Sequence, residues 1–536
     1  DLTTTGVTGA SVASVSGSGA AYTVTVNTGT GNGTIRLDVS ASSDIKDSSG
    51  NGLDGLPYEG GEIYAVVKFN HCYVDINANG LNNGSSWDDA YSDLQSALAE
   101  NACTEIWVAA GTYYPTSGND RAISFELKSG VEIYGGFAGT ETQRSGRDVD
   151  ANATILSGDI GTQGDKGDNS YHVVYANNVN NTAVLDGFTV TGGNANGGWS
   201  NNNGGGMYNN NSSPTLTNVA FSANSANSGG GMYNNAGSST LTDVAFSANS
   251  ADDYGGGMFN SNGSPELTGV SFNNNSSPRG GGMYNDSSSP TLTDVTFSGN
   301  AATFGGGMFN LKSSPSLTKV TFSGNNTTAA GGGMYNWDNS SPELTNVTFS
   351  DNSASYGGGM VNSASSSTLT NVLLANSTGS NCANDDGGSI NSSSRHNLID
   401  DNTCGLTDGV NGNKIGPGYN ANLGPLANNG GFTQTHALLA GSAAIDAGDD
   451  AACPATDQRG VARPQGAHCD IGAYEYVDND APTVVSITRA NANPTSALSA
   501  DFTVTFSEDV TGVDQSDFTL TKTGNLSGFS VASVTP

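Results

Sequence analysis

The apolar positions between residues 204 and 375 recur every 25 or 26 residues. Each repeat opens with the phrase GGGM, and half a repeat later an LTxVxF phrase alternates apolar and polar residues as a half-buried strand does. An Asn follows three residues after the Phe. A spacing of two within each phrase and about 25 between phrases predicts short strands in a solenoid, because one such unit cannot bury its own apolar face.

Stacked coils place identical positions about 4.8 Å apart, so the repeats predict ladders of like side chains. The expected core ladders are Met207, Met232, Met258, Met283, Met308, Met334 and Met360, with Phe221, Phe246, Phe272, Phe297, Phe322 and Phe349. The expected amide ladder is Asn224, Asn249, Asn275, Asn300, Asn325 and Asn352. The fold class predicted is all-β, a right-handed parallel β-helix with partial Ig-like sandwich segments at both ends.

The net charge of the chain limits the classes of binding partner that we expect. Lys and Arg number 17 against 50 Asp and Glu, and the net charge of −33 disfavours nucleic acid and anionic membranes. No apolar run approaches the ~18 residues of a membrane span, so no membrane insertion is expected. Residues 1–20 lack a signal-peptide pattern, which indicates a mature, processed or excerpted chain.

Six cysteines form three couples of neighbours along the chain, and an even number at short separations favours disulfides in an extracellular or bacterial cell-surface location. Metal ligation is the alternative, but the sequence contains no CxxC and its histidines are scattered. Six cysteines allow 15 connectivities, and loop length alone selects nearest neighbours. The candidates are Cys72 with Cys103, Cys382 with Cys404, and Cys453 with Cys469.

Residues 68–150 are expected to hold the cap and first coils. Ser86 and Asp89 have the spacing of a capping box, and Tyr91, Leu94 and Leu98 would share one face of a short helix that covers the open end of the stack. Residues 151–380 contain the repeats, and residues 381–476 the last coils and a closing segment.

The GGGMYN and FxxN phrases resemble those of secreted bacterial right-handed β-helix proteins, including the polymorphic outer-membrane proteins. Residues 422–476, from "NLGPLANNGGF" to "CDIGAYEY", resemble the choice-of-anchor segment that closes such helices. The resemblance covers about residues 71–476, and it implies an architecture but no particular activity.

The two ends resemble complementary halves of a bacterial Ig-like domain: residues 477–536 the N-terminal half, residues 1–67 the C-terminal half. "LTKTGNLSGFSVASV" (520–534) aligns with "LTTTGVTGASVASV" (2–15) with one gap. Either the chain is one period of a longer tandem array, or one subunit completes the next by strand complementation into a head-to-tail filament. The expected partner is therefore a second copy or a further tandem module.

Candidate chemistry is sparse. In the column after LT, Asp243 and Asp294 lie two coils, roughly 10 Å, apart with Gly269 between them, and we interpret this as surface variation. Calcium is the one cofactor considered. Its candidate ligands are Asp75, Asn77 and Asn79 in DINANG, with Asp478, Asp480 and Glu508 near the C-terminus.

The residue after each Met is aromatic in all repeats but the last, and if Met faces inward, as we expect, these rings form a partly covered outer stripe. The sequence therefore predicts a non-catalytic extracellular structural protein, a subunit of a filament, stalk or adhesin, and not an enzyme. The alternatives are a carbohydrate-active β-helix enzyme, which needs acids and a base on one face, and an adhesin that binds surface polysaccharide through the stripe.

Overall fold

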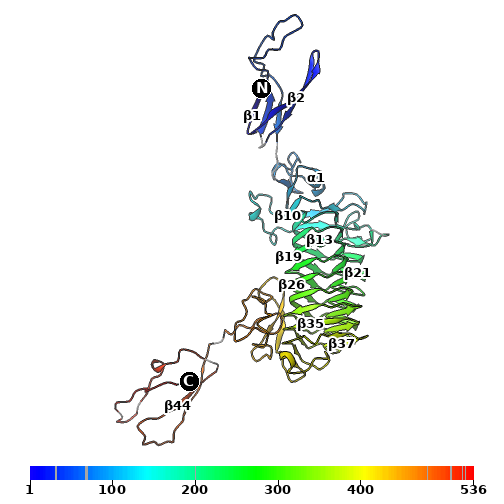
Figure 1. Ribbon diagram of the computed structural model, residues 1–536. Helices are drawn as coiled ribbons and strands as arrows, with labels where there is room; N and C mark the ends of the chain where they lie inside the picture. The colour runs from blue at the N-terminus through cyan, green and yellow to red at the C-terminus, as the bar shows by residue number, and fades with distance from the viewer. Residues whose placement is uncertain are drawn as a thin grey trace. The chain divides into compact units, whose positions relative to one another are not determined.

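The computed structural model describes residues 1–29, 33–66, 71–198, 201–479, 481–507, 510–521, 523–525 and 527–535. It is almost entirely β, and its main body is a parallel β-solenoid of about eleven turns (Figure 1). The chain divides into two compact units, residues 1–476 and 477–536, and each is described by itself.

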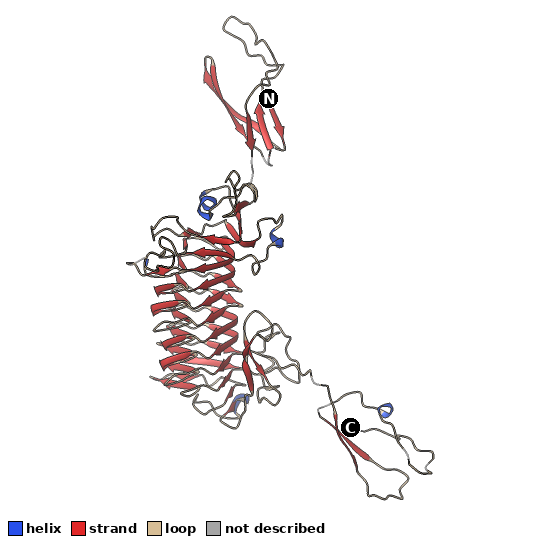
Figure 2. Cartoon of the chain, turned by 180° about the vertical axis from the view of Figure 1, so that it is seen from behind, coloured by secondary structure: helices blue, strands red, loops and turns tan. Residues whose placement is uncertain are grey.

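Three parallel sheets run along the solenoid, and Figure 2 shows their strands stacked in layers. The largest sheet contains β6 (Cys72–Val74), β7 (Glu105–Ala109), β8 (Gly111–Tyr113), β10 (Glu132–Phe137), β11 (Thr154–Ser157), β13 (Val184–Thr191), β16 (Thr215–Ser222), β19 (Thr240–Thr242), β20 (Ala245–Ser247), β23 (Glu266–Thr268), β24 (Ser271–Asn273), β26 (Thr291–Ser298), β29 (Ser316–Ser323), β32 (Glu343–Thr345), β33 (Thr348–Ser350), β35 (Ser366–Thr370), β36 (Leu373–Ala375), β38 (Ser389–Ile390), β39 (Leu398–Ile399) and β40 (Lys414–Ile415). We call it the LT sheet.

The second sheet contains β9 (Phe125–Glu126), β12 (Val174–Asn177), β15 (Met207–Asn210), β18 (Met232–Asn235), β22 (Met258–Ser261), β25 (Met283–Asp286), β28 (Met308–Leu311), β31 (Met334–Trp337), β34 (Met360–Ser363) and β37 (Cys382–Asp385). The third side is shorter and discontinuous: β14 (Asn194–Ala195), β17 (Ser225–Ser228) and β21 (Ser250–Tyr254) form one piece, β27 (Ala301–Phe304) and β30 (Asn326–Ala330) another.

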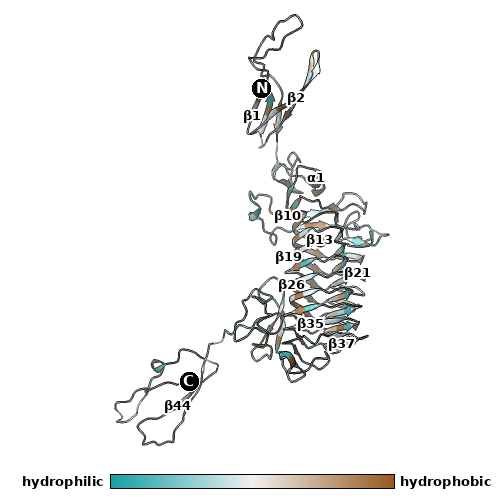
Figure 3. Ribbon diagram, viewed as in Figure 1, coloured by the Kyte–Doolittle hydropathy of each residue, from teal (hydrophilic) through white to brown (hydrophobic). Residues whose placement is uncertain are grey.

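The repeats stack in register, so Met207 pairs with Met232 and Phe221 with Phe246. The seven methionines and the six phenylalanines of the predicted ladders are fully buried. Successive Phe rings stack with centroids 4.6–5.0 Å apart, which is the spacing between paired strands. Figure 3 shows the corresponding mixture of hydrophobic and hydrophilic positions along the strands.

Two buried amide ladders run through the stack. Along the predicted series from Asn224 to Asn352, each Nδ2 donates to the Oδ1 of the Asn in the next coil at 2.8–3.1 Å. A second series, from Asn209 to Asn384 in the GGGMYN strands, repeats the arrangement at 2.8–3.1 Å and was not predicted. Each buried amide thereby finds a partner that an isolated coil cannot supply.

The predicted cap helix begins later than its sequence signal. Helix α1 spans Leu94–Ala99, and its N-cap is Asp93, whose side chain accepts the N–H of Ser96. The Ser86 hydroxyl accepts the N–H of Asp89 within a turn and starts no helix. Leu94 and Leu98 are buried against the first coil, where a disulfide joins Cys72 to Cys103.

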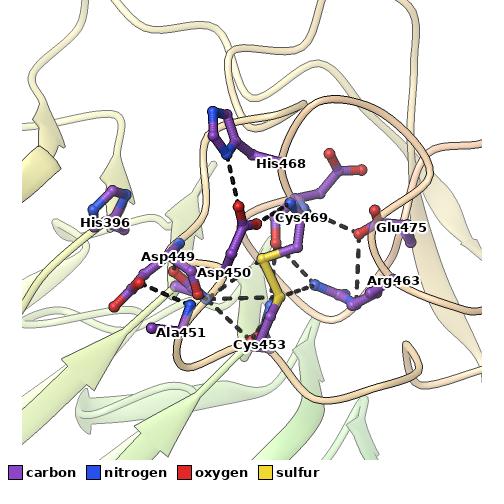
Figure 4. Close-up of a disulfide and its surroundings, with 12 residues drawn as sticks. His396, Asp449, Asp450, Ala451, Cys453, Arg463, His468, Cys469 and Glu475 are labelled. Carbon is purple, nitrogen blue, oxygen red and sulfur yellow. Dashed lines mark hydrogen bonds and ion pairs between the residues drawn. A yellow bond between two sulfur atoms is a disulfide. The ribbon is translucent and has the colours of Figure 1, made fainter.

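The closing segment, residues 422–476, lies along the side of the LT sheet (Figure 1). Its hairpin is β41 (Leu423–Ala427) with β42 (Thr435–Leu438). A disulfide joins Cys453 to Cys469, and Arg463 and Glu475 are buried beside it (Figure 4). The third disulfide, Cys382–Cys404, ties the last coils. All six cysteines are therefore paired as nearest neighbours.

Residues 1–66 carry a three-stranded antiparallel sheet in the order β1 (Leu2–Thr5), β4 (Gly33–Leu37), β5 (Ile63–Val66), and a hairpin of β2 (Ser11–Ser18) with β3 (Ala21–Asn27). In the second unit, the described strands are β43 (Val484–Arg489) and β44 (Phe502–Phe506), which pair as a hairpin. Three short 3-10 helices are described, at Arg144–Gly146, Val410–Gly412 and Gln515–Asp517.

Within the described ranges, no helix is long and apolar enough to cross a membrane.

Candidate functional site

One column of the LT sheet carries a polar side chain in every repeat but one, where it is a glycine. It holds the residue after LT, which adopts a left-handed backbone conformation with φ between 50° and 65°. The left-handed conformation bends each coil in the middle of its LTxVxF phrase. At this residue the side chain therefore does not follow the regular alternation between core and solvent of the neighbouring strand residues. The column is Asn218, Asp243, Gly269, Asp294, Lys319, Asn346 and Asn371.

Asp243 leans along the column toward the next coil. A Cβ placed on Gly269 would overlap Asp243 Oδ1, so the carboxylate occupies the space that a side chain at 269 would take. Asp243 is half-buried, and burial raises the pKa of its carboxyl above the ordinary Asp value. The absence of a side chain at Gly269 thus leaves room for the Asp243 carboxylate in the coil between Asp243 and Asp294.

Asp294 is paired with a cation. Lys319 Nζ lies 2.9 Å from its Oδ1 and 3.1 Å from its Oδ2, and the lysine side chain is 9% exposed. Burial raises the pKa of Asp294, while the hydrogen bond and charge of Lys319 oppose this rise. Asp243 and Asp294 therefore sit in different electrostatic environments on one face.

The polar series continues through the preceding coil. Asp186 Oδ2 lies 2.6 Å from the Arg147 guanidinium, and Asn218 donates to Asp186 Oδ1 at 3.2 Å. Toward the later coils, residues of the closing segment form hydrogen bonds with the column. Thr433 donates to the carbonyl of Asp294, and Asn346 donates to the carbonyl of Asp470. Contacts of the closing segment with this column run from Asp294 to Asn371, so Asp294 lies at their border.

Polar groups gather where the chain enters the strands of the LT sheet. A shallow depression of about 400 Å³ lies at the start of its strands, lined by Val179, Asn180, Asn181, Ser213, Ser238, Thr240, Ser264 and Glu266. Thr240 precedes Asp243 by three residues, and Glu266 precedes Gly269 by three. Hydroxyl, amide and carboxylate groups along an open face are the donors and acceptors that hydrogen-bond to sugar hydroxyls.

The aromatic residues that follow the methionines face outward and stack on one another. Tyr208, Tyr233, Phe259, Tyr284, Phe309 and Tyr335 point away from the methionine core but stack face to face, with centroids 4.8–5.5 Å apart and planes within 11°. Tyr254 and Phe304 pack against them. Because each ring face already contacts a neighbouring ring, the faces are not free to stack on sugar rings.

The candidate calcium ligands remain predictions. Asp75 Oδ1 accepts the N–H of Asn77, and the Asn79 amide donates to the carbonyl of Asn77, a polar turn. Asp478 lies in the second unit, while Asp480 and Glu508 fall outside the described residues. Among the residues that are described, no three His, Cys, Asp or Glu gather as a metal site would require.

Comparisons with known proteins concern the fold. No family model and no curated protein matches the sequence. Among solved structures, pectate lyase Pel9A is similar with a TM-score of 0.47 and 16% identity, over 76% of this chain and 96% of that one. The catalytic domain of a GH87 alpha-1,3-glucanase in complex with nigerose is similar with a TM-score of 0.25 and 10% identity, over 62% and 73%.

The comparisons contradict the expectation that the protein is not an enzyme, because the similar solved structures are named as a pectate lyase and a GH87 glucanase. In the column after LT, Asp243 Oδ1 lies where a Cβ at Gly269 would stand, and Lys319 pairs with Asp294. The interpretation of Asp243 and Asp294 as surface variation stays a prediction.

Proposed function

We propose that the chain is an extracellular carbohydrate-active protein that hydrolyses a neutral polysaccharide on the LT sheet. The observation that carries the proposal is the arrangement of Asp243 and Asp294 in one column, with the Asp243 carboxylate in the space that Gly269 leaves between them. Three disulfides support an oxidising location.

The spacing favours hydrolysis with inversion. Backbones two coils apart are separated by about 9.6 Å, and Asp243 Oδ1 lies one coil toward Asp294, where a Cβ at Gly269 would stand. Inverting glycosidases hold two carboxyl groups about 6.5–9.5 Å apart, which leaves room for a water molecule and the scissile bond.

Burial raises the pKa of both aspartates, and the two differ in their partners. Asp243 has no lysine or arginine partner among its described ion pairs, so we assign it the role of general acid. Asp294 has Lys319 to favour its ionised form and suits the general base. Asp294 takes a proton from water as the water oxygen bonds to the anomeric carbon, and Asp243 protonates the departing glycosidic oxygen.

Charge favours a neutral substrate. The chain carries a net charge of −33, and a polyanion such as pectate would be repelled unless cations screened it. A neutral glycan meets no such barrier and finds hydroxyl and amide partners along the depression beside Thr240.

A substrate panel tests this proposal. The full chain is incubated with neutral glucans, mannans and xylans, and in parallel with pectate and alginate, while reducing ends and unsaturated products are measured. Reducing ends from a neutral glycan support the proposal. Unsaturated products from a polyanion would replace hydrolysis by a lyase reaction, and no product from any polymer would contradict it.

A further inference from the structure

The same sequence phrase occurs near both ends of the chain but forms strands at only one. In residues 1–66, LTTTG provides β1, which pairs with β4 from Leu2↔Leu37 to Thr5↔Thr34, and SVASV begins β2, which pairs with β3. The matching LTKTG and SVASV at 520–534 form no strand in their described residues. In residues 1–66 the strands that pair with the phrase, β3 and β4, follow it along the chain.

The second unit has strands but no core. Of its described residues between 481 and 535, none is buried. Ile487 pairs with Val504 and Arg489 with Phe502, so Ile487, Val504 and Phe502 share one face of the hairpin. Ile487 is 61% exposed and Phe502 53%. A two-stranded hairpin with an uncovered apolar face is marginal in water, so this face needs a covering surface.

Residues 1–66 have a small core and an exposed strand edge. Among their described residues, the hydrophobic core contains three buried side chains, Val7, Ile35 and Val66. Strand β5 pairs only with β4 among the described strands, and its Ile63 and Tyr64 are 63% and 77% exposed. A free strand edge with apolar side chains is a template for pairing with another chain.

We infer that the hairpin β43–β44 of one copy docks on residues 1–66 of a second copy and that the two together form one sandwich. The shared phrase supports this occupant, because it follows β43–β44 at one end and precedes β3–β5 at the other, which places both halves in the order of one domain. The contact joins different surfaces, so it leaves a free half at each end of a pair and propagates into a chain.

The charges of the two surfaces predict how the contact between copies depends on salt concentration. Acidic residues outnumber basic residues in both 1–66 and 477–536, so the two surfaces repel each other at low ionic strength. Added salt screens this repulsion and strengthens the apolar contact.

The test measures the mass of the full chain by light scattering, and its shape by negative-stain electron microscopy, across protein and salt concentrations. Wild type is expected to form linear oligomers that lengthen with salt. Ile487→Asp blocks the C-terminal face and Tyr64→Asp the N-terminal one, so each variant alone should remain monomeric. Leu498→Asp is the matched control, because Leu498 is fully exposed in a loop of the same unit and should leave oligomers intact.

Mixing the two blocked variants provides the sharper measurement. Each retains one functional half, so an equimolar mixture should stop at a dimer of two 54.1 kDa chains and form nothing longer. This outcome also shows that neither variant merely unfolds. A wild-type chain that stays monomeric at all concentrations, or oligomers that survive both substitutions, would overturn the inference.

Discussion

Lys319 Nζ lies 2.9 Å from Oδ1 of Asp294, the residue at the same position of the preceding coil. The ammonium group favours the ionised carboxylate, against the burial that raises the pKa of Asp294. Lys319→Met removes the charge and keeps the stem, so the pKa of Asp294 should rise further. If Asp294 is the general base, the acidic limb of the pH–rate profile moves to higher pH. Lys312→Met, an exposed lysine paired with Asp338, should leave the limb in place.

Gly269 holds open the space that the Asp243 carboxylate fills. Gly269→Ala should displace this carboxylate and lower the rate by about 10²-fold, because displacements near 1 Å misalign a catalytic group. Its φ of 65° also strains any L side chain. Gly324→Ala separates the two effects, since Gly324 has φ 62° and nothing within 4 Å of an added Cβ. Comparable activity losses in both variants would argue against a role for Asp243.

The Asn ladder should stabilise the stack locally. Asn275 Oδ1 accepts from both the backbone N–H and the side-chain amide of Asn249, and its own amide donates to Asn300. Asn275→Ala leaves these buried groups unpaired, at about 2–3 kcal/mol. Hydrogen exchange should accelerate at the Asn249 amide and the adjacent coils more than at the solenoid ends. Asn262→Ala, at an exposed turn, is the control; equal exchange in the two variants would show that the ladder adds nothing.

The closing segment should loosen as pH rises. Burial raises the pKa of Asp470 to about 7, although backbone N–H groups of Tyr476 and Asp446 oppose the rise. The unfolded carboxyl titrates near 3.9, so the folded state binds an extra proton between these values. This contribution to stability is complete below about pH 4 and is lost as pH rises to about 7. The thermal unfolding midpoint of wild type should therefore fall more steeply between about pH 4 and pH 7 than that of Asp470→Asn. Identical slopes would exclude Asp470 as the source.

The sequence predicts the solenoid well because its ladders depend only on the repeat. Met207 and Met232, or Phe221 and Phe246, meet wherever coils stack in register. The predicted start of the cap helix was wrong, because Ser86 and Asp89 close a turn and Asp93 caps α1. The second Asn ladder was missed although Asn209 and its equivalents recur in every GGGMYN phrase.

The site was harder to predict because it depends on where one side chain is missing. The repeat places Asp243 and Asp294 in one column, but the position of the Asp243 carboxylate over Gly269 becomes visible only in the folded structure. The burial of Lys319 likewise depends on the closing segment, whose Thr456 lies 3.4 Å from Nζ and more than a hundred residues away in sequence. Contacts of that range leave no local signal.

The most direct test of the central claim is the release of reducing ends from a neutral polysaccharide by wild type, Asp243→Asn, Asp294→Asn and Asp252→Asn. Asp252 is an exposed aspartate on β21, outside the LT sheet, and receives the same substitution. The account predicts that each of the first two variants loses about 10²–10⁴-fold in rate, while Asp252→Asn and the thermal unfolding of all variants remain close to wild type. Undiminished hydrolysis by Asp243→Asn and Asp294→Asn would contradict it.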